Sequence, residues 1–333
     1  MSAARLRRRR QAMAVAVATL GLVVFTAGAL VWRGARLAPP APGAGGLVAP
    51  DAASLIARTA TVRVTLASRP YRLERRGAVW LMPERGDYPV RPDAIAALTR
   101  GLEGLRLDSP VGVAPDRLAA LGLDDPREGG SGALLELLDP QGRALFARII
   151  GVRPGGTFVR APGAAPGFRA EGALPPLQDP AAWLDLAILS MAPQAVARVD
   201  VVPLSGPAYA IVATGAGGFA PLGREAFSQA NATAAATALT RWRPVDVRPA
   251  ASLPPGPAAR HMTTSRGGLA VLAEARTVDG QTFVTLRAQA LRPEAQEAAD
   301  ALNARAEGWA FALAAYDAAD YLFTDADMAP GGR

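Results

Sequence analysis

The chain has one histidine, His261, which Thr263 and Ser265 follow in the stretch PAARHMTTSRGG. A histidine and a hydroxyl side chain, oriented by a carboxylate, are the residue types that many hydrolases use for nucleophilic catalysis. In α/β-hydrolases the hydroxyl lies on a sharp turn from a strand into a helix, marked by a G-x-S-x-G pattern that this stretch lacks. We therefore expect His261 to lie in a solvated loop without a catalytic role.

Glycine clusters at residues 129–132, 155–156 and 215–218 raise phosphate binding as a second kind of chemistry. A glycine-rich phosphate loop lies between a strand and the N-terminus of a helix, and its P-loop version adds a lysine. This chain contains no lysine, because all 36 of its basic residues are arginines. We predict that the three clusters form turns.

Four aspartates near the C-terminus raise metal binding as a third kind of chemistry: Asp317, Asp320, Asp325 and Asp327. Their oxygen atoms suit calcium, but their spacing does not match an EF-hand loop. We expect them to form the solvated edge of a terminal strand and an amphipathic helix. A chain without cysteine also forms no disulfide, thiolate zinc site or lipid-modified cysteine. We predict no enzyme activity and no catalytic, cofactor-binding or metal-binding residues.

The formal charge of +7 is concentrated in the first 36 residues. Seven arginines and no acidic residue lie there, whereas the remainder carries 29 basic and 29 acidic residues. A neutral domain gains little from the counterion release that drives binding to nucleic acids. We therefore predict no nucleic-acid partner. With 333 residues, half of them hydrophobic, the chain is long enough to bury a substantial core.

Residues 12–32 form an uncharged, mostly apolar stretch of 21 residues. As a helix with a rise of about 1.5 Å per residue, the stretch matches the ~30 Å hydrocarbon core of a bilayer. Four consecutive arginines precede it, and basic residues favour the cytoplasmic side. We predict a cytoplasmic basic tail at residues 1–11 and a single transmembrane anchor at residues 12–33 of the inner (cytoplasmic) membrane. The rest of the chain is then periplasmic or otherwise extracytoplasmic.

Three other interpretations of this segment are open. Ala27, Gly28 and Ala29 resemble a signal-peptide cleavage site, although the apolar stretch exceeds the usual length of about 7 to 15 residues. The paired arginines resemble a twin-arginine signal without the consensus that follows it. A buried core helix fits poorly with arginines crowded at one end. Residues 34–58 begin with a stretch rich in proline, glycine and alanine, and we predict a linker there.

Two segments of the remaining chain repeat the same landmarks in the same order, with an offset that stays between 137 and 141 residues. In the first segment the landmarks are alternating residues 62–66, residues 71–73, Gly77, Trp80 and a helix from about Asp93. In the second they are residues 199–204, residues 209–211, Gly215, Phe219 and a helix from about Asn231. We predict an internal repeat, with one α+β unit at residues 59–192, a second at residues 193–327 and a tail at residues 328–333.

Alternating patterns predict antiparallel strands within each unit. We expect strands at residues 133–138 and 144–151 and, as their counterparts, at residues 269–276 and 282–288. Residues 180–189 are expected to form a helix that joins the units. Asn231 matches an N-glycosylation site with Ala232 and Thr233, and we expect it to cap the second helix. The predicted fold class is α+β, with an N-terminal transmembrane helix followed by two tandem α+β units with antiparallel sheets.

Four stretches, in this order, resemble a bacterial family called domain of unknown function 4340: YRLERRGAVWLMPERGDYPVRPDAIAALTRGL, LGLDDP, RIIGVRPGGTFVRAPG and WLDLAILSMAPQAVARVDV. The resemblance covers roughly residues 62–327. It implies an N-terminal anchor, tandem α+β units and frequent association with gliding-type ABC transporter components. It implies no catalytic residues.

We therefore expect a non-catalytic, membrane-anchored extracytoplasmic protein that serves as an accessory or interaction module of an envelope or ABC-type transport complex. Its expected partners are the membrane and a membrane protein complex, and no cofactor is expected. The alternative is a periplasmic domain that binds a ligand or glycan in a cleft between the two repeats. Trp80, Trp183 and Trp242 offer stacking surfaces for that role unless they are core residues.

Overall fold

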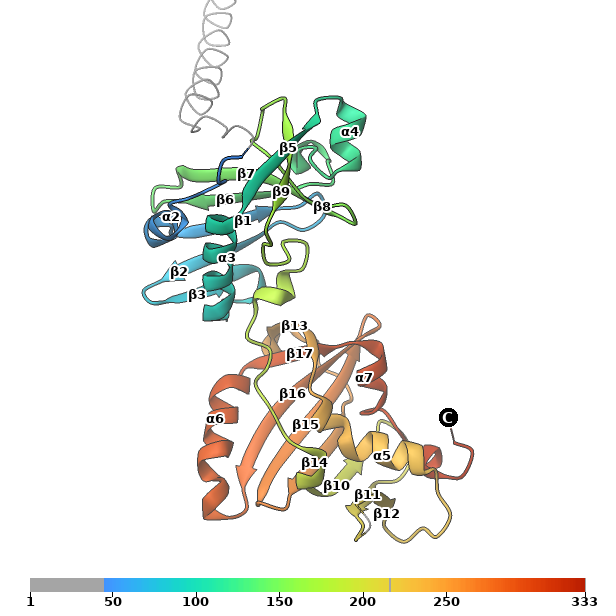
Figure 1. Ribbon diagram of the computed structural model, residues 1–333. Helices are drawn as coiled ribbons and strands as arrows, with labels where there is room; N and C mark the ends of the chain where they lie inside the picture. Colours follow the sequence, from blue (N-terminus) through green and yellow to red (C-terminus); the bar gives the residue numbers. More distant parts are fainter. Residues whose placement is uncertain (1–44, 216, 333) are drawn as a thin grey trace, which may run out of the picture. The chain divides into compact units, whose positions relative to one another are not determined.

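The computed structural model describes residues 45–215 and 217–332, which form two antiparallel sheets accompanied by helices (Figure 1). The predicted α+β class is therefore confirmed. The predicted tail at residues 1–11 and anchor at residues 12–33 lie outside the described residues, as does the first part of the predicted linker. Among the residues that are described, no helix combines the length and the apolar character needed to cross a membrane.

The first sheet has nine strands within the described residues, in the order β4-β3-β2-β1-β6-β7-β8-β9-β5. Its strands are β1 (Thr61–Thr65), β2 (Tyr71–Arg76), β3 (Val79–Met82), β4 (Tyr88–Pro89), β5 (Arg106–Gly112), β6 (Ala133–Leu138), β7 (Ala144–Arg153), β8 (Gly156–Arg160) and β9 (Gly167–Glu171). The helices in this part of the chain are α2 (Ala52–Arg58), α3 (Pro92–Gly104) and α4 (Pro115–Ala120).

The second sheet has eight strands within the described residues, in the order β12-β11-β10-β14-β15-β16-β17-β13. Its strands are β10 (Val196–Val202), β11 (Tyr209–Ala213), β12 (Phe219–Pro221), β13 (Pro244–Pro249), β14 (Ala259–Ser265), β15 (Leu269–Val278), β16 (Gln281–Ala290) and β17 (Trp309–Leu313). The helices that follow in this part of the chain are α5 (Gln229–Thr237), α6 (Gln296–Ala306) and α7 (Ala315–Ala319).

The two sheets share one topology. When the short strand β4 is set aside, each sheet has the order third, second, first, fifth, sixth, seventh, eighth and fourth strand along the chain. In both, a helix lies between the third and fourth strands, α3 in one and α5 in the other. The five landmarks of the first segment coincide with β1, β2, the turn between β2 and β3, β3 itself, and α3. Those of the second segment coincide with β10, β11, the turn between β11 and β12, β12 itself, and α5. The predicted repeat is thus present in the strand order.

The later strands correspond differently from the prediction. Strand order makes β14 the counterpart of β6 and β15 the counterpart of β7, whereas we expected residues 269–276 to match residues 133–138. The expected pairing is shifted by one strand because the sequence pattern does not mark β14 as a strand. The side chains that β14 turns inward are Ala259, His261, Thr263 and Ser265. Three of these four are polar, so the strand lacks a clear apolar alternation.

The chain divides into two compact units that are not continuous in sequence. Of the described residues, the first unit contains 45–71 and 96–178, and the second contains 72–95 and 179–332. The boundaries at residues 59–192 and 193–327, drawn from the repeat, stay a prediction.

Leucines dominate the core of the first unit. Helix α3 lies over one face of the first sheet (Figure 1), and its Leu98 and Leu102, together with Leu105 just beyond its end, are fully buried. Their spacing of four and three residues places them on one side of the helix. A further buried cluster joins Leu118 of α4 to Phe158 of β8 through apolar side chains between them.

Alanines take a larger part in the core of the second unit. Helix α5 packs against β10, β11 and β12, and it buries Ala232, Ala235 and Ala236. Helix α6 packs against β15 and β16 and buries Leu302 between two alanines. Strand β17 adds two large buried apolar side chains, Phe311 and Leu313. The buried apolar side chains of α5 are therefore smaller than those of α3.

Residues 180–189 do not form the predicted helix. One 3-10 turn spans Pro180–Trp183. Asp179 caps its start, because the Asp179 side chain accepts a hydrogen bond from the backbone N–H of Ala181 at 3.0 Å. The chain then continues in extended form, with Leu184, Leu186 and Ile188 buried. Burial of every second residue is the period of a strand, so the apolar pattern here was assigned the wrong period.

Proline occurs in every edge strand of the two sheets and in no inner strand of the described chain. The edge strands β4, β5, β12 and β13 contain the following prolines: Pro89, Pro110, Pro221, Pro244 and Pro249. Proline has no backbone N–H to donate to a neighbouring strand, so it is tolerated where a sheet ends.

Candidate functional site

A groove of about 780 Å³ runs beside α5 in the second unit. One wall comes from α5, where Ala230, Thr233 and Ala234 present small side chains. The opposite wall comes from α7 and the chain after it, with Tyr316 and Phe323 as the large aromatic side chains. Because the helix surface is mostly alanine, the groove is wide and its walls are largely apolar.

The ion pair Arg241–Asp320 lies in the lining of this groove. The guanidinium Nη2 of Arg241 donates to Asp320 and, at 3.2 Å, to the backbone carbonyl of Ala234 at the end of α5. Burial raises the pKa of Asp320 to about 6, although Arg241 acts in the opposite direction. This carboxyl group therefore changes its charge near pH 6.

The C-terminal segment beyond α7 is held against α5 by polar contacts. The backbone N–H of Ser228 donates to the carbonyl of Met328 at 2.9 Å, and the Asn231 side chain donates to the carbonyl of Asp327 at 2.7 Å. The Asp327 carboxylate accepts from the N–H and the hydroxyl of Thr324 at 2.8 and 2.6 Å. These contacts fix one side of the groove.

Two expectations are wrong at this site. We predicted that the late aspartates form a solvated edge, but Asp320 and Asp327 are each only 7% exposed, and Asp325 pairs with Arg224. Carboxylates are buried when each has a hydrogen-bond partner, which the spacing of the aspartates does not reveal. We also predicted Asn231 as a helix cap. Ser228 is the N-cap of α5, and its side chain accepts from the backbone N–H of Asn231 at 3.4 Å.

His261 lies on β14 and is buried, so the expected solvated loop is wrong. Its Nε2 lies 3.0 Å from the backbone carbonyl of Tyr321, and a carbonyl only accepts, so Nε2 carries the proton. Burial lowers the pKa of His261 to about 4. Ser265 lies four residues along the same strand, a separation of about 13 Å, and its hydroxyl accepts from the N–H of Leu269. These two side chains therefore do not form a catalytic pair.

The tryptophans weighed as stacking surfaces are mostly core residues. Trp183 is fully buried, and Trp242 is 9% exposed, with its indole N–H donating to the carbonyl of Leu186 at 3.1 Å. Trp80 on β3 is partly buried. The predicted glycine turns are confirmed at residues 155–156 and 215–218, which connect consecutive strands, and residues 129–132 lead into β6.

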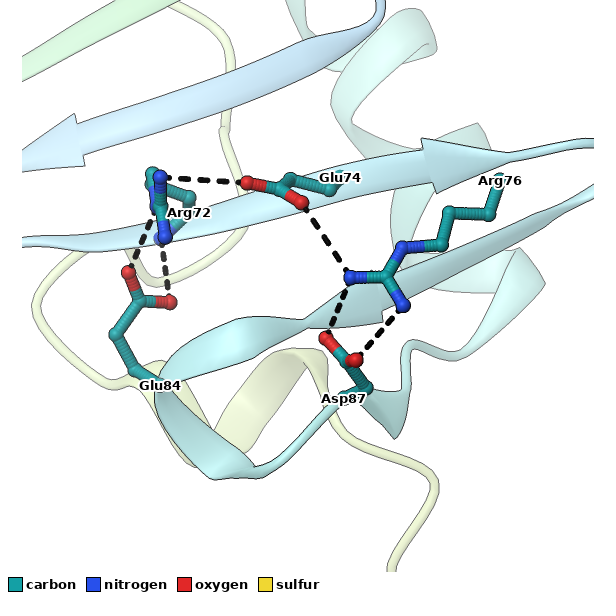
Figure 2. Close-up of polar contacts among 5 residues, drawn as sticks. All are labelled: Arg72, Glu74, Arg76, Glu84 and Asp87. Atoms are coloured by element: carbon teal, nitrogen blue, oxygen red, sulfur yellow. Dashed lines mark hydrogen bonds and ion pairs between the residues drawn. The ribbon is translucent and has the colours of Figure 1, made fainter.

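A chain of ion pairs runs along β2 (Figure 2). This strand belongs to the first sheet, but its residues from Arg72 onward are part of the second compact unit. Figure 2 shows Arg72, Glu74 and Arg76 on one face of β2, linked in the order Glu84, Arg72, Glu74, Arg76 and Asp87. Arg76 binds Asp87 through two hydrogen bonds of 2.7 and 2.9 Å, and the backbone of Asp87 is left-handed with φ 66°. All five side chains are between 28% and 52% exposed, so each ion pair contributes little to stability.

A family comparison bears on these residues. The family model described as domain of unknown function (DUF4340) matches residues 80–255, which is more than half of the chain. The chain belongs to this family. Comparison with curated proteins and with solved structures returned no match.

The DUF4340 match divides the groove. It includes α5 with Asn231 and also Arg241, but it ends before β14 and so excludes Tyr316 and Asp320. The family description assigns no function, so it assigns no role to any of these residues. Within residues 45–215 and 217–332, no three His, Cys, Asp or Glu side chains are grouped so as to hold a metal ion.

Sequence reasoning missed the pair of Arg241 and Asp320, which are 79 residues apart. The only local signal was an arginine directly after an alanine-rich helix, and it does not indicate which carboxylate the arginine meets. Tyr316 lies in α7 and is 78% exposed, which its sequence context does not indicate.

Proposed function

We propose that this protein is a non-catalytic, membrane-anchored interaction module that serves as an accessory of an envelope or ABC-type transport complex. The apolar stretch at residues 12–32 and the arginines before it support a single anchor in the cytoplasmic membrane, with the two α+β units on the extracytoplasmic side. The groove beside α5 is the surface through which the module contacts its partner.

Tyr316 is the observation that carries this proposal. It is the most exposed of the large hydrophobic side chains in the described chain, and it stands at the edge of a largely apolar groove. Exposed aromatic side chains beside a hydrophobic groove mark protein interaction sites, since tyrosine contributes strongly to binding when it becomes buried. The small side chains of α5 allow the backbone of a partner helix to approach closely.

Site-specific photocrosslinking in native membranes tests the proposal. The full chain carries a photoreactive phenylalanine derivative at position 316 or, as a matched control, at Leu291, which is 55% exposed and lies outside the groove. We expect position 316 to form an adduct with an ATPase, permease or other subunit of a transport complex, and position 291 to form none. Equal adducts at both positions, or none at 316, would contradict the proposed contact surface.

The orientation is tested separately with a C-terminal alkaline phosphatase fusion, which is active only outside the cytoplasm. We expect an active fusion in membranes. A fusion that is inactive, paired with a C-terminal fluorescent protein that folds only in the cytoplasm, would contradict the extracytoplasmic placement.

A further inference from the structure

A second groove, separate from the one beside α5, lies on the open face of the second sheet. Arg260 on β14 is directly opposite Glu274 on β15, which is opposite Thr285 on β16. One row away, Leu272 is opposite Arg287. Residues that face each other across antiparallel strands, and their neighbours two positions along, share one face of a sheet. These five side chains therefore form a single surface, and each lines the groove.

The end of α6 and the turn after it form the wall of this groove. Ala306 ends α6, Glu307 lies in the turn, and Trp309 begins β17. The groove has a volume of about 660 Å³. Small-molecule sites are typically about 300–1,000 Å³. Asn303 is also part of the wall, but its amide group is already used: it accepts from the N–H of Ala288 at 2.7 Å and donates to the carbonyl of Ala288 at 2.9 Å.

The charges in the groove balance. Arg260 donates through Nε to one carboxylate oxygen of Glu274 at 2.8 Å. This bond uses one of the five guanidinium N–H groups and one of the two carboxylate oxygens. Arg287 and Glu307 are exposed, and neither has an ion-pair partner among the described residues. Two arginines and two glutamates give no net attraction for an anion or a cation. They do place donors and acceptors side by side.

An apolar surface completes the lining. The ring of Trp309 is held edge to face against Tyr88, with 4.8 Å between the ring centroids, so the indole has a fixed orientation. Leu272 and Ala306 lie in the same lining. A sugar ring has the matching chemistry, because its hydroxyl groups both donate and accept hydrogen bonds while its C–H face packs on apolar or aromatic surfaces.

We propose that this groove binds a short uncharged saccharide. The Arg260–Glu274 pair receives adjacent hydroxyl groups, Arg287 donates to a further oxygen, and Trp309 packs on a ring face. This binding goes beyond the proposed contact with a membrane complex and uses other residues of the second unit.

The full chain is tested in lipid nanodiscs, because common detergents carry sugar headgroups. Cellotriose, maltotriose and chitotriose are titrated by calorimetry, and trialanine is the probe for peptide binding. We expect at least one trisaccharide to bind with a Kd of about 1 mM or tighter. We expect Glu274→Gln and Arg287→Ala each to weaken that binding at least tenfold.

Asp200→Asn is the matched control. Asp200 on β10 pairs with Arg198 and lies on the same face of the sheet, because it is opposite Met262, which is opposite Leu272, but it does not line the groove. We expect this variant to bind the trisaccharide as the unaltered chain does, and all three variants to keep the melting temperature within a few degrees.

Absence of binding by all three trisaccharides, binding that Glu274→Gln and Arg287→Ala leave intact, or tighter binding of trialanine would each overturn the proposal. The crosslink at position 316 is measured with the same variants. Because Glu274 and Arg287 lie outside the groove beside α5, we expect its yield to stay unchanged, so a failure here is distinct from a failure of the proposed function.

Discussion

Helices α3 and α5 hold the same place in the strand order of their sheets, yet they bury different side chains. Leu98 and Leu102 of α3 are fully buried, whereas the best-buried apolar residues of α5 are alanines. Burial of apolar surface stabilises by about 25 cal/mol per Å², so the leucines contribute more. Around α5, hydrogen bonds such as that from the Asn231 side chain to the Asp327 carbonyl also contribute to stability. One topology is thus stabilised mainly by apolar volume in one sheet and partly by polar contacts in the other.

The largest expected effect separates the two helices directly. Leu102→Ala removes a fully buried side chain and leaves a cavity, so we expect a loss of about 2–5 kcal/mol in the free energy of unfolding. Ala235→Gly in α5 removes one methyl group and lowers helix propensity, for about 1 kcal/mol. Native-state hydrogen exchange on the full chain in nanodiscs resolves the two sheets. Equal losses would remove the contrast between the helices.

The second prediction concerns pH and belongs to the second unit alone. The pKa of His261 is lowered from 6.5 to about 4, so the folded state binds fewer protons than the unfolded chain between these values. His261 therefore contributes stability that is present above pH 6.5 and is lost as pH falls towards 4, by roughly 3 kcal/mol. Asp320, whose pKa is raised to about 6, acts with the opposite sign, since its contribution is lost as pH rises from about 4 to 6.

His261→Gln isolates the histidine, because glutamine keeps a donor for the Tyr321 carbonyl but does not titrate between pH 4 and 7. Denaturant unfolding is measured across that range. We expect the free energy of unfolding of the unaltered chain, relative to that of His261→Gln, to fall as pH is lowered from 7 to 4. A difference that is constant from pH 7 to pH 4 would show that His261 is not the group responsible.

The third prediction concerns the C-terminal segment. Asn231→Ala removes the donor to the carbonyl of Asp327, and an unsatisfied buried polar group costs about 1–3 kcal/mol. Limited proteolysis should cut the chain after α7 faster in this variant. Gln289→Ala, at an exposed position of β16, is the control. If cleavage is equally slow in both variants, the segment is not held by Asn231.

The smallest effect is expected in the ion-pair chain of Figure 2. Glu74→Gln breaks the link between Arg72 and Arg76 at its centre, and exposed ion pairs contribute about 0–1 kcal/mol. Thermal unfolding at low and at 0.5 M salt should show a small loss that shrinks as salt increases. A loss as large as that of Leu102→Ala would mean that polar contacts stabilise both regions alike.

Sequence reasoning reached the first part of each repeat and failed further along. Alternation and helical spacing predicted β1, β2 and α3, because apolar residues with one clear period determine those elements. The repeated landmarks then predicted their counterparts, including the alanine-rich α5. Strand β14 was missed because most of its inward residues are polar, and their burial depends on partners such as the Tyr321 carbonyl, 60 residues away. The extended run after Trp183 was missed because a short apolar run fits a helix and a strand equally well.

The grooves were also beyond reach from the sequence. The groove beside α5 depends on Arg241 meeting Asp320, and the groove on the second sheet depends on the register that sets Arg260 opposite Glu274. The pairing of Arg241 with Asp320 joins residues 79 apart, which no local pattern encodes. The register of β14 on β15 follows from their turn and their inward residues, so it could be derived only once β14 was recognised as a strand.

The prolines of the four edge strands have a consequence for crowding. A protein confined to a surface meets its own copies far more often than one free in solution, and exposed strand edges are where such copies would join into fibrils. With a residue that lacks an N–H group in β4, β5, β12 and β13, neither sheet offers a continuous row of donors to a neighbouring molecule. The edges of both sheets are therefore poor templates for strand addition by a further copy of the chain.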